Sequence, residues 1–123
     1  MPRTILVVED EPLVRLVIAE ALRDQGFRVV EAASAEEAVL ALASGIAVNL
    51  VFTDVRMPGV LDGIAFAQWL KRERADLPVL ITSGHLDRLE SGDATAFISK
   101  PYALADAVAR ISAMLDPSSK ENI

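Results

Sequence analysis

Residues 48–54 read Val48-Asn49-Leu50-Val51-Phe52-Thr53-Asp54, and this stretch decides the fold. An apolar run of this length predicts a buried strand, and here the run ends in a lone carboxylate. The carboxyl ends of strands line the binding crevice in open α/β sheets. Asp54 is therefore placed for chemistry.

Two other apolar runs end in charged residues. Residues 4–9 form one run, which closes on Glu9 and Asp10, and residues 96–99 form the other, which Lys100 follows. Two of the three predicted strands thus end in acidic residues, and the third ends in a basic one. This pattern indicates a metal-assisted phosphoryl acceptor.

The order of elements predicts the architecture. Strands are expected over residues 4–9, 27–31, 48–53, 78–82 and 96–99, with helices between most of them. Alternating strands and helices indicate right-handed crossovers and a mostly parallel sheet. We therefore expect an α/β fold with a doubly wound five-stranded sheet in the order 2-1-3-4-5 and helices on both faces. Asp10 and Asp54 would then face each other at the switch point between strands 1 and 3.

Particular residues predict where the first two helices begin and where the first one ends. Pro12 suits the first turn of a helix, and Ser34 with Glu37 forms a capping-box pattern that opens the next one. Gly26 is expected to end the first helix. Its apolar face is predicted from the spacing of Val14, Val17, Ile18, Ala21 and Leu22.

Composition excludes several classes of protein. Hydrophobic residues make up 52% of the chain, and no apolar stretch is long enough to span a membrane. The N-terminus lacks the features of a signal peptide. The absence of cysteine excludes disulfides and thiolate zinc sites. A net charge of −6 argues against binding to nucleic acid or anionic membranes. We expect a cytoplasmic protein.

The acidic strand ends predict a Mg²⁺ site. Three carboxylates at close quarters repel one another unless a cation intervenes, and Mg²⁺ prefers oxygen ligands. Asp10 and Asp54 would be direct ligands, whereas Glu9 would act through water. The loop after Asp54 would supply a backbone carbonyl, from Arg56.

The remaining polar residues suit a phosphoryl group. A metal-bound Asp54 carboxylate can attack phosphorus and form an acyl phosphate. Lys100 would supply a positive charge for the phosphoryl oxygens. Ser83 would supply a hydroxyl donor, and Gly84 beside it leaves room for the group.

These residues together carry a resemblance to a known family: Glu9-Asp10, Asp54 with Met57-Pro58-Gly59, Ser83-Gly84 and Lys100-Pro101. In order and in the spacing of 44 positions from Asp10 to Asp54, the chain resembles the receiver domain of two-component response regulators. The resemblance runs from Ile5 to about Leu115. We expect one receiver domain over residues 1–117 and a frayed tail over 118–123.

The resemblance implies a role for each residue that matches. Asp54 would be the phosphoacceptor, and Glu9 and Asp10 would bind Mg²⁺. Lys100 would contact the phosphoryl group, with Lys100-Pro101 as a cis peptide. Ser83 would be the switch hydroxyl.

Three further positions have roles implied by the same resemblance. Phe97 falls at the aromatic switch position, and its movement would bias a surface formed by the fourth helix, fifth strand and last helix. Arg56 and His85 occupy two variable positions that would influence the lifetime of the acyl phosphate.

The sequence departs from the family pattern in two places. The loop before Asp62-Gly63 is one residue longer than usual. Only 17 positions separate Ser83 from Lys100, which is fewer than usual. The fourth helix is therefore expected to be short or missing.

The predicted function is that of a phosphorylation-dependent switch. It would take a phosphoryl group from a histidine kinase or a histidine phosphotransfer protein, and it would pass the signal to a downstream effector protein or serve as a phosphate sink. We do not expect an enzyme, because the chain would catalyse only its own phosphorylation and dephosphorylation. The chain is either a single-domain regulator or a piece of a larger protein.

Three alternative functions fit the sequence less well. A haloacid-dehalogenase-like phosphatase would need a second Asp two positions after Asp54, where Arg56 stands. A flavodoxin-like nucleotide or flavin binder would need a glycine-rich phosphate loop after the first strand. A receiver fold used only for docking would not need all five site residues.

Overall fold

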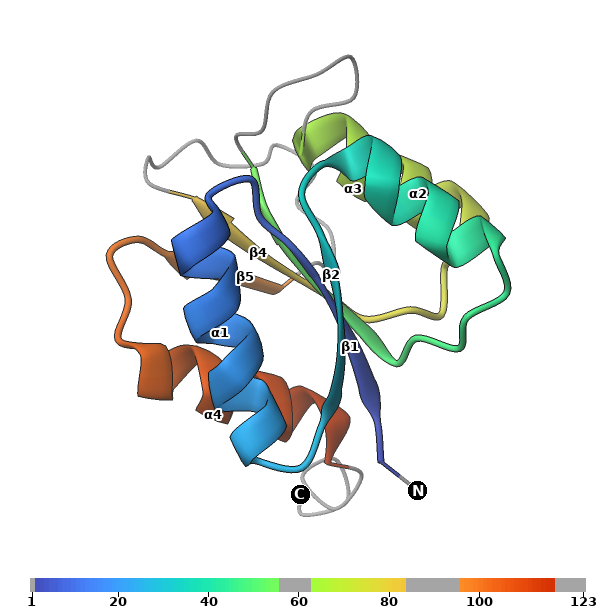
Figure 1. The fold of residues 1–123 in the computed structure, drawn as a ribbon. Helices are drawn as coiled ribbons and strands as arrows, with labels where there is room; N and C mark the ends of the chain where they lie inside the picture. Colours follow the sequence, from blue (N-terminus) through green and yellow to red (C-terminus); the bar gives the residue numbers. More distant parts are fainter. Residues whose placement is uncertain (1, 56–62, 84–95, 117–123) are drawn as a thin grey trace, which may run out of the picture.

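Five parallel strands form one sheet in the order β2-β1-β3-β4-β5, and helices lie on both sides of it (Figure 1). The computed structural model describes residues 2–55, 63–83 and 96–116, apart from the side chain of Ser83. The elements in chain order are β1 (Thr4–Val8), α1 (Pro12–Asp24), β2 (Arg28–Ala32), α2 (Ala35–Ala43), β3 (Leu50–Asp54), α3 (Gly63–Glu73), β4 (Val79–Ser83), β5 (Ala96–Ser99) and α4 (Leu104–Leu115). The predicted fold class and strand order are confirmed.

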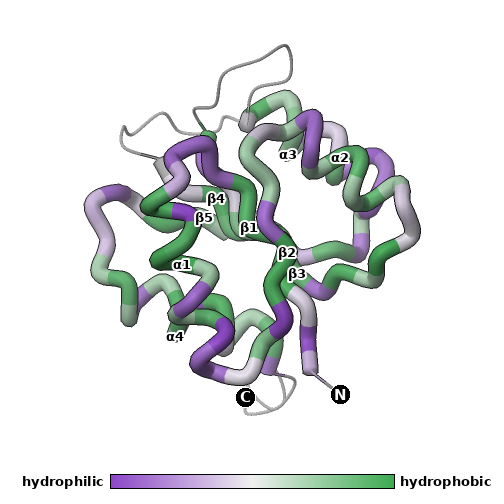
Figure 2. The backbone as a smooth tube through the Cα atoms, in the orientation of Figure 1, coloured by the Kyte–Doolittle hydropathy of each residue, from purple (hydrophilic) through white to green (hydrophobic). Residues whose placement is uncertain are grey.

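The sheet divides the hydrophobic core into two halves. Side chains alternate between the two faces of a strand, so Leu6 and Val8 of β1 pack against α2 and α3, whereas Ile5 and Val7 pack against α1 and α4. These four residues are at most 1% exposed. Figure 2 shows the corresponding hydrophobic stretch of β1 between the helical layers. Burial on both faces explains why the central strands read as continuous apolar runs.

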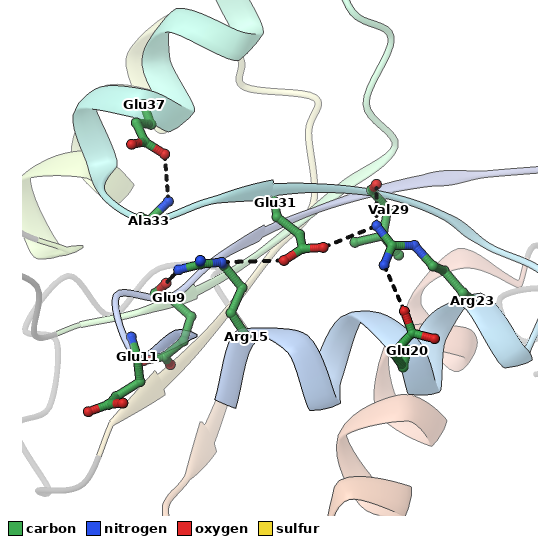
Figure 3. A network of polar contacts seen from close by, with 9 residues as sticks. All are labelled: Glu9, Glu11, Arg15, Glu20, Arg23, Val29, Glu31, Ala33 and Glu37. Carbon is green, nitrogen blue, oxygen red and sulfur yellow. Dashed lines mark hydrogen bonds and ion pairs between the residues drawn. The ribbon is translucent and has the colours of Figure 1, made fainter. Parts of the chain in front are cut away.

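The predicted helix starts are confirmed. Pro12 is the first residue of α1, where its missing N–H costs little. Ser34 caps α2, because its hydroxyl oxygen accepts a hydrogen bond of 3.1 Å from the N–H of Glu37. The Glu37 carboxylate accepts from the N–H of Ala33 at 2.8 Å (Figure 3), one residue before the position that a capping box normally uses.

The predicted apolar face of α1 is only partly right. Ile18 and Leu22 are buried, together with Ala19, but Val14 is 40% exposed and Val17 is 52% exposed. Helical periodicity identifies an apolar side of a helix, but it cannot show how much of that side a neighbouring element covers. The covered stripe on α1 is narrower than its apolar surface.

The bounds of β5 are as predicted, and those of the other four strands differ from the predicted ones by one or two residues. β3 begins at Leu50 rather than Val48, since Asn49 uses its N–H to donate to the Thr4 carbonyl oxygen and its side-chain oxygen to accept from the Thr4 N–H, both at 2.8 Å. The Lys100-Pro101 peptide bond is cis, as predicted.

Two predictions about secondary structure fall outside the described residues. They are the short or missing fourth helix, which concerns residues 84–95, and the tail over 118–123. Within the described ranges, no helix is both long and apolar enough to cross a membrane.

Gly63 brings the start of α3 against the end of β3. Its N–H donates to the carbonyl oxygen of Val55 at 2.9 Å. A Cβ atom at this position would collide with the carbonyl oxygens of Asp54 and Val55. These are backbone atoms, which cannot rotate away as a side-chain tip can. Only glycine therefore lets α3 begin this close to Asp54.

We predict that Gly63→Ala destabilises the protein by about 1–3 kcal/mol, the usual cost of overpacking. Urea denaturation of the wild type and the variant measures this difference. Gly45→Ala is the matched control, because Gly45 has a φ of 94° but open space around it. The control should cost about 1–2 kcal/mol through backbone strain alone, without disturbing the end of β3. An unchanged stability of Gly63→Ala would contradict the prediction.

Candidate functional site

Charged side chains gather at the carboxyl ends of β1, β3 and β5. Glu9 and Asp10 directly follow β1, Asp54 is the last residue of β3, and Lys100 directly follows β5. Because β1 lies beside β3, the acidic pair meets Asp54 at the switch point of the sheet. Glu9 is 5% exposed and Asp54 6% exposed, whereas Asp10 is exposed to solvent.

The three carboxylates lie close enough to share one cation. Glu9, Asp10 and Asp54 can each offer one carboxylate oxygen, and these oxygens lie within 4.8 Å of one another. The pKa of Glu9 is raised to about 7 by burial and by the negative charges of Asp54 and Asp10, against the opposing effects of the Glu11 N–H and Lys100. The site thus has an excess of negative charge that is poorly solvated.

Lys100 partly balances this charge. Its Nζ donates to Oδ2 of Asp54 at 2.7 Å, a hydrogen-bonded ion pair. The Asp54 side chain is 7% exposed and that of Lys100 32% exposed. A lysine ammonium so placed can also donate to other negatively charged oxygens near Asp54, because it has three N–H groups.

The donor set fits Mg²⁺. The cluster offers carboxylate oxygens only, which Mg²⁺ prefers over nitrogen or sulfur. The cluster also has one exposed member, so water can complete the coordination shell. Glu9, Asp10 and Asp54 are the described residues that would hold the ion.

Tyr102 lies beside the site, and no pattern in the sequence indicated that it would. Its ring meets that of Phe52 edge-on, with the centroids 6.2 Å apart. Burial raises the pKa of Tyr102 to about 12, with further contributions from the charges of Glu9 and Asp54. The phenol therefore stays protonated and neutral at physiological pH.

Thr82 is a second residue that the sequence did not single out. It pairs with Asp54 across β3 and β4, so the two side chains leave the same face of the sheet. Thr82 is 3% exposed, and its hydroxyl has no hydrogen-bond partner among the described residues. A buried hydroxyl without a partner is unusual.

The remaining predicted site residues are tested only in part or not at all. Arg56 and His85 lie outside the described residues, as does the side chain of Ser83, whose backbone ends β4. Phe97 lies in β5 opposite Ile81 and is half-buried. Its switching role stays a prediction.

Comparison with known proteins finds similar sequences and structures. A model of the response regulator receiver domain family matches residues 5–112. The transcriptional regulatory protein PdtaR of Mycobacterium tuberculosis is 35% identical over 116 residues, which cover 90% of this chain and 56% of PdtaR. The chain spans about half the length of several curated relatives that it matches.

Two solved structures share the fold. A response regulator receiver protein from Sinorhizobium medicae has a TM-score of 0.84 and 29% identity, with 93% of this chain and 94% of that chain covered. The response regulator protein TrrA from Thermotoga maritima, solved in complex with Mg²⁺ and BeF, has a TM-score of 0.80 and 25% identity, with 92% and 99% covered.

We predict that Glu9→Gln stabilises the metal-free protein above neutral pH. The pKa of Glu9 rises from 4.5 to about 7 on folding, so the folded state binds more protons between these values and wild-type stability falls as the pH rises through this window. The Glu9→Gln variant has no carboxyl group at this position, so its stability does not fall in this way. Its advantage should be absent below pH 4.5 and reach about 3 kcal/mol above pH 7, at about 1.4 kcal/mol for each pKa unit.

Urea denaturation at pH 4 and pH 8 with a chelator present measures this difference. Glu11→Gln is the control, because it removes an exposed neighbouring acid and leaves Glu9 in place. A Glu9→Gln advantage that is equal at both pH values would contradict the prediction.

Proposed function

The chain belongs to the family of response regulator receiver domains, and from this premise we propose that Asp54 accepts a phosphoryl group in a Mg²⁺-dependent reaction. The observation that supports this most directly is the position of Asp54. It is buried at a strand end, within a cluster of carboxylates and 2.7 Å from Lys100. A carboxylate can act as the nucleophile that forms an aspartyl phosphate, and a metal and a lysine supply the positive charge that phosphoryl transfer needs.

Each residue of the cluster has a part in the proposed reaction. A carboxylate oxygen of Asp54 forms a bond to phosphorus while the bond from phosphorus to the donor nitrogen breaks, and the electron pair stays on that nitrogen. Lys100 lies close enough to donate to a phosphoryl oxygen of the product. When bound by Glu9, Asp10 and Asp54, Mg²⁺ would supply the positive charge that neutralises the phosphoryl oxygens. The product is an acyl phosphate on Asp54.

The other predicted residues would act around this reaction. The Arg56 carbonyl would complete the metal site, and Ser83 with Phe97 would pass the signal from the phosphoryl group to a protein-binding surface. Arg56 and His85 would set the lifetime of the acyl phosphate. The chain would act on its own Asp54 only, which distinguishes it from a phosphatase with a separate substrate.

We further propose that the phosphoryl donor is a protein, a histidine kinase or a histidine phosphotransfer protein. An apolar surface borders the site: Leu13 of α1 is 73% exposed and Val17 is 52% exposed. Both line a shallow groove with Lys100, Pro101 and Tyr102. A donor that brings its phosphohistidine to Asp54 must cover the residues around the site, so this apolar face would be buried against it.

We predict that incubation with phosphoramidate and Mg²⁺ adds one phosphoryl group to the chain. Intact-mass spectrometry measures the adduct. Asp54→Ala should abolish it, and a chelator should abolish it in the wild type. Asp76→Ala, which removes an exposed aspartate, should leave it unchanged. An adduct that persists in Asp54→Ala would refute the assignment of the phosphoacceptor.

We predict that Leu13→Glu combined with Val17→Glu slows phosphorylation by a protein donor at least tenfold, because the substitutions put charge into an apolar interface. Phosphorylation by phosphoramidate should stay within twofold of the wild-type rate, since a small donor needs no docking surface. Leu40→Glu is the control, because Leu40 is 70% exposed on α2, in the opposite helical layer. Equal slowing with both donors would show damage to the site instead of lost docking.

The measurement uses a kinase that phosphorylates the wild-type chain, loaded with labelled phosphate before mixing. Rates are compared at a kinase concentration below saturation, where a loss of docking has its full effect.

A further inference from the structure

We propose that Arg15 is a positioning residue for the Mg²⁺ site, although its side chain contributes no ligand atom. This inference rests on the proposed function. Arg15 lies in the first turns of α1, and its guanidinium reaches back to the backbone that leads into the acidic pair (Figure 3). A side chain of the helix thereby contacts the segment that carries two of the three carboxylates.

The guanidinium makes two hydrogen bonds in different directions. Nη1 donates to the backbone carbonyl oxygen of Glu9 at 2.8 Å, and Nε donates to Oε1 of Glu31 at 3.3 Å. The Arg15 side chain is only 20% exposed. Arginine presents its N–H groups in a rigid planar fork, so the Glu31 contact fixes the direction in which Nη1 points.

The contact with the Glu9 carbonyl bears on Asp10, the next residue in the chain. The peptide unit is planar, so the direction of the Glu9 carbonyl sets the direction in which the chain enters Asp10. Asp10 is the exposed member of the carboxylate cluster. Holding the Glu9 carbonyl therefore fixes the position of the Asp10 Cα atom, from which the Asp10 carboxylate reaches the cluster.

The other polar groups of Glu9 are held as well. Its N–H donates to the carbonyl oxygen of Ala32 on β2 at 3.0 Å, and its Oε2 accepts from the N–H of Glu11 at 3.1 Å. Arg15 adds a restraint on the carbonyl oxygen, and this restraint is made by a side chain from α1. Without it the Glu9 carbonyl oxygen loses its hydrogen-bond donor among the described residues.

Glu31 is itself anchored from the far side. Its Oε2 accepts from Nη2 of Arg23 at 3.2 Å, and Arg23 also donates to Oε2 of Glu20 at 3.1 Å and to the Val29 carbonyl oxygen at 3.3 Å. The chain of contacts thus ties Arg15 to both α1 and β2 (Figure 3). The side chains of Glu31, Arg23 and Glu20 are 29%, 38% and 60% exposed, and ion pairs at such exposure add little to stability. The main effect of this network is therefore to hold the Arg15 guanidinium in position.

The positive charge of Arg15 and its contact with the Glu9 carbonyl predict opposite changes in Mg²⁺ affinity when Arg15 is replaced. Removing a cation beside an acidic cluster would by itself strengthen Mg²⁺ binding. Releasing the Glu9 carbonyl would weaken it, because residues that orient metal ligands contribute about 10–100-fold to affinity. The sign of the change therefore separates the two effects.

The test is the Mg²⁺ dissociation constant, measured by isothermal titration calorimetry at pH 8 on the intact chain. We expect Arg15→Ala to weaken binding by about tenfold. Arg15→Lys should weaken it at least as much, because lysine keeps the positive charge that opposes Mg²⁺ binding but cannot make the two-way contact. Arg28→Ala is the control for charge, because it removes an exposed arginine at the other end of β2. The control should not weaken binding.

Circular dichroism and thermal unfolding confirm that each variant is folded, and Arg15→Lys carries the test if Arg15→Ala is not. Unchanged or tighter binding in the Arg15 variants, with normal binding by the wild type, would overturn the role of Arg15 alone. A wild type that does not bind Mg²⁺ would overturn the proposed function and this inference with it.

Discussion

Glu9 and Asp54 are both buried at the carboxyl ends of neighbouring strands, where their negative charges repel and lack the solvation of water. The surrounding structure reduces this cost in several ways. Lys100 pairs with Asp54, and the N–H of Glu11 donates to the carboxylate of Glu9. Neither contact outweighs burial, which with the charges of Asp54 and Asp10 raises the pKa of Glu9. A cluster built in this way favours the uptake of a proton or a cation, which is the property that a metal-dependent phosphoacceptor needs.

Much of this arrangement could be predicted from the sequence. In a parallel α/β sheet every strand ends at the same edge, so charged residues that close apolar runs must meet there. That rule, together with the predicted strand order 2-1-3-4-5, brings Glu9, Asp10, Asp54 and Lys100 to the same edge of the sheet. It depends on chain order and strand polarity, which a sequence shows directly, and not on the rotation of any helix or the register of any strand.

The parts that could not be predicted depend on packing detail. Thr82 reaches the site because β4 pairs with β3 in a particular register, and a shift of one residue would turn it to the other face. Val17 is exposed although its position fits the apolar stripe of α1, because the extent of coverage depends on neighbours far along the chain. The contact of Arg15 with Glu9 runs between a helix and the loop before it, and no periodic pattern identifies it.

Helix α1 contributes to the core, to the apolar surface beside the site and to the backbone of the acidic pair. One stripe of it seals the core through Ile18 and Leu22, and another leaves Leu13 and Val17 exposed beside the site. Arg15, on the same helix, holds the backbone of the acidic pair. A partner that bound the exposed stripe and displaced α1 relative to β2 would also displace the Arg15 guanidinium from the Glu9 carbonyl. Any such change in Mg²⁺ affinity must be matched by an equal change in the affinity for the partner once Mg²⁺ is bound, because linkage between two binding sites is reciprocal. The position of Arg15 on α1 is what would give this chain a physical connection between docking and metal binding.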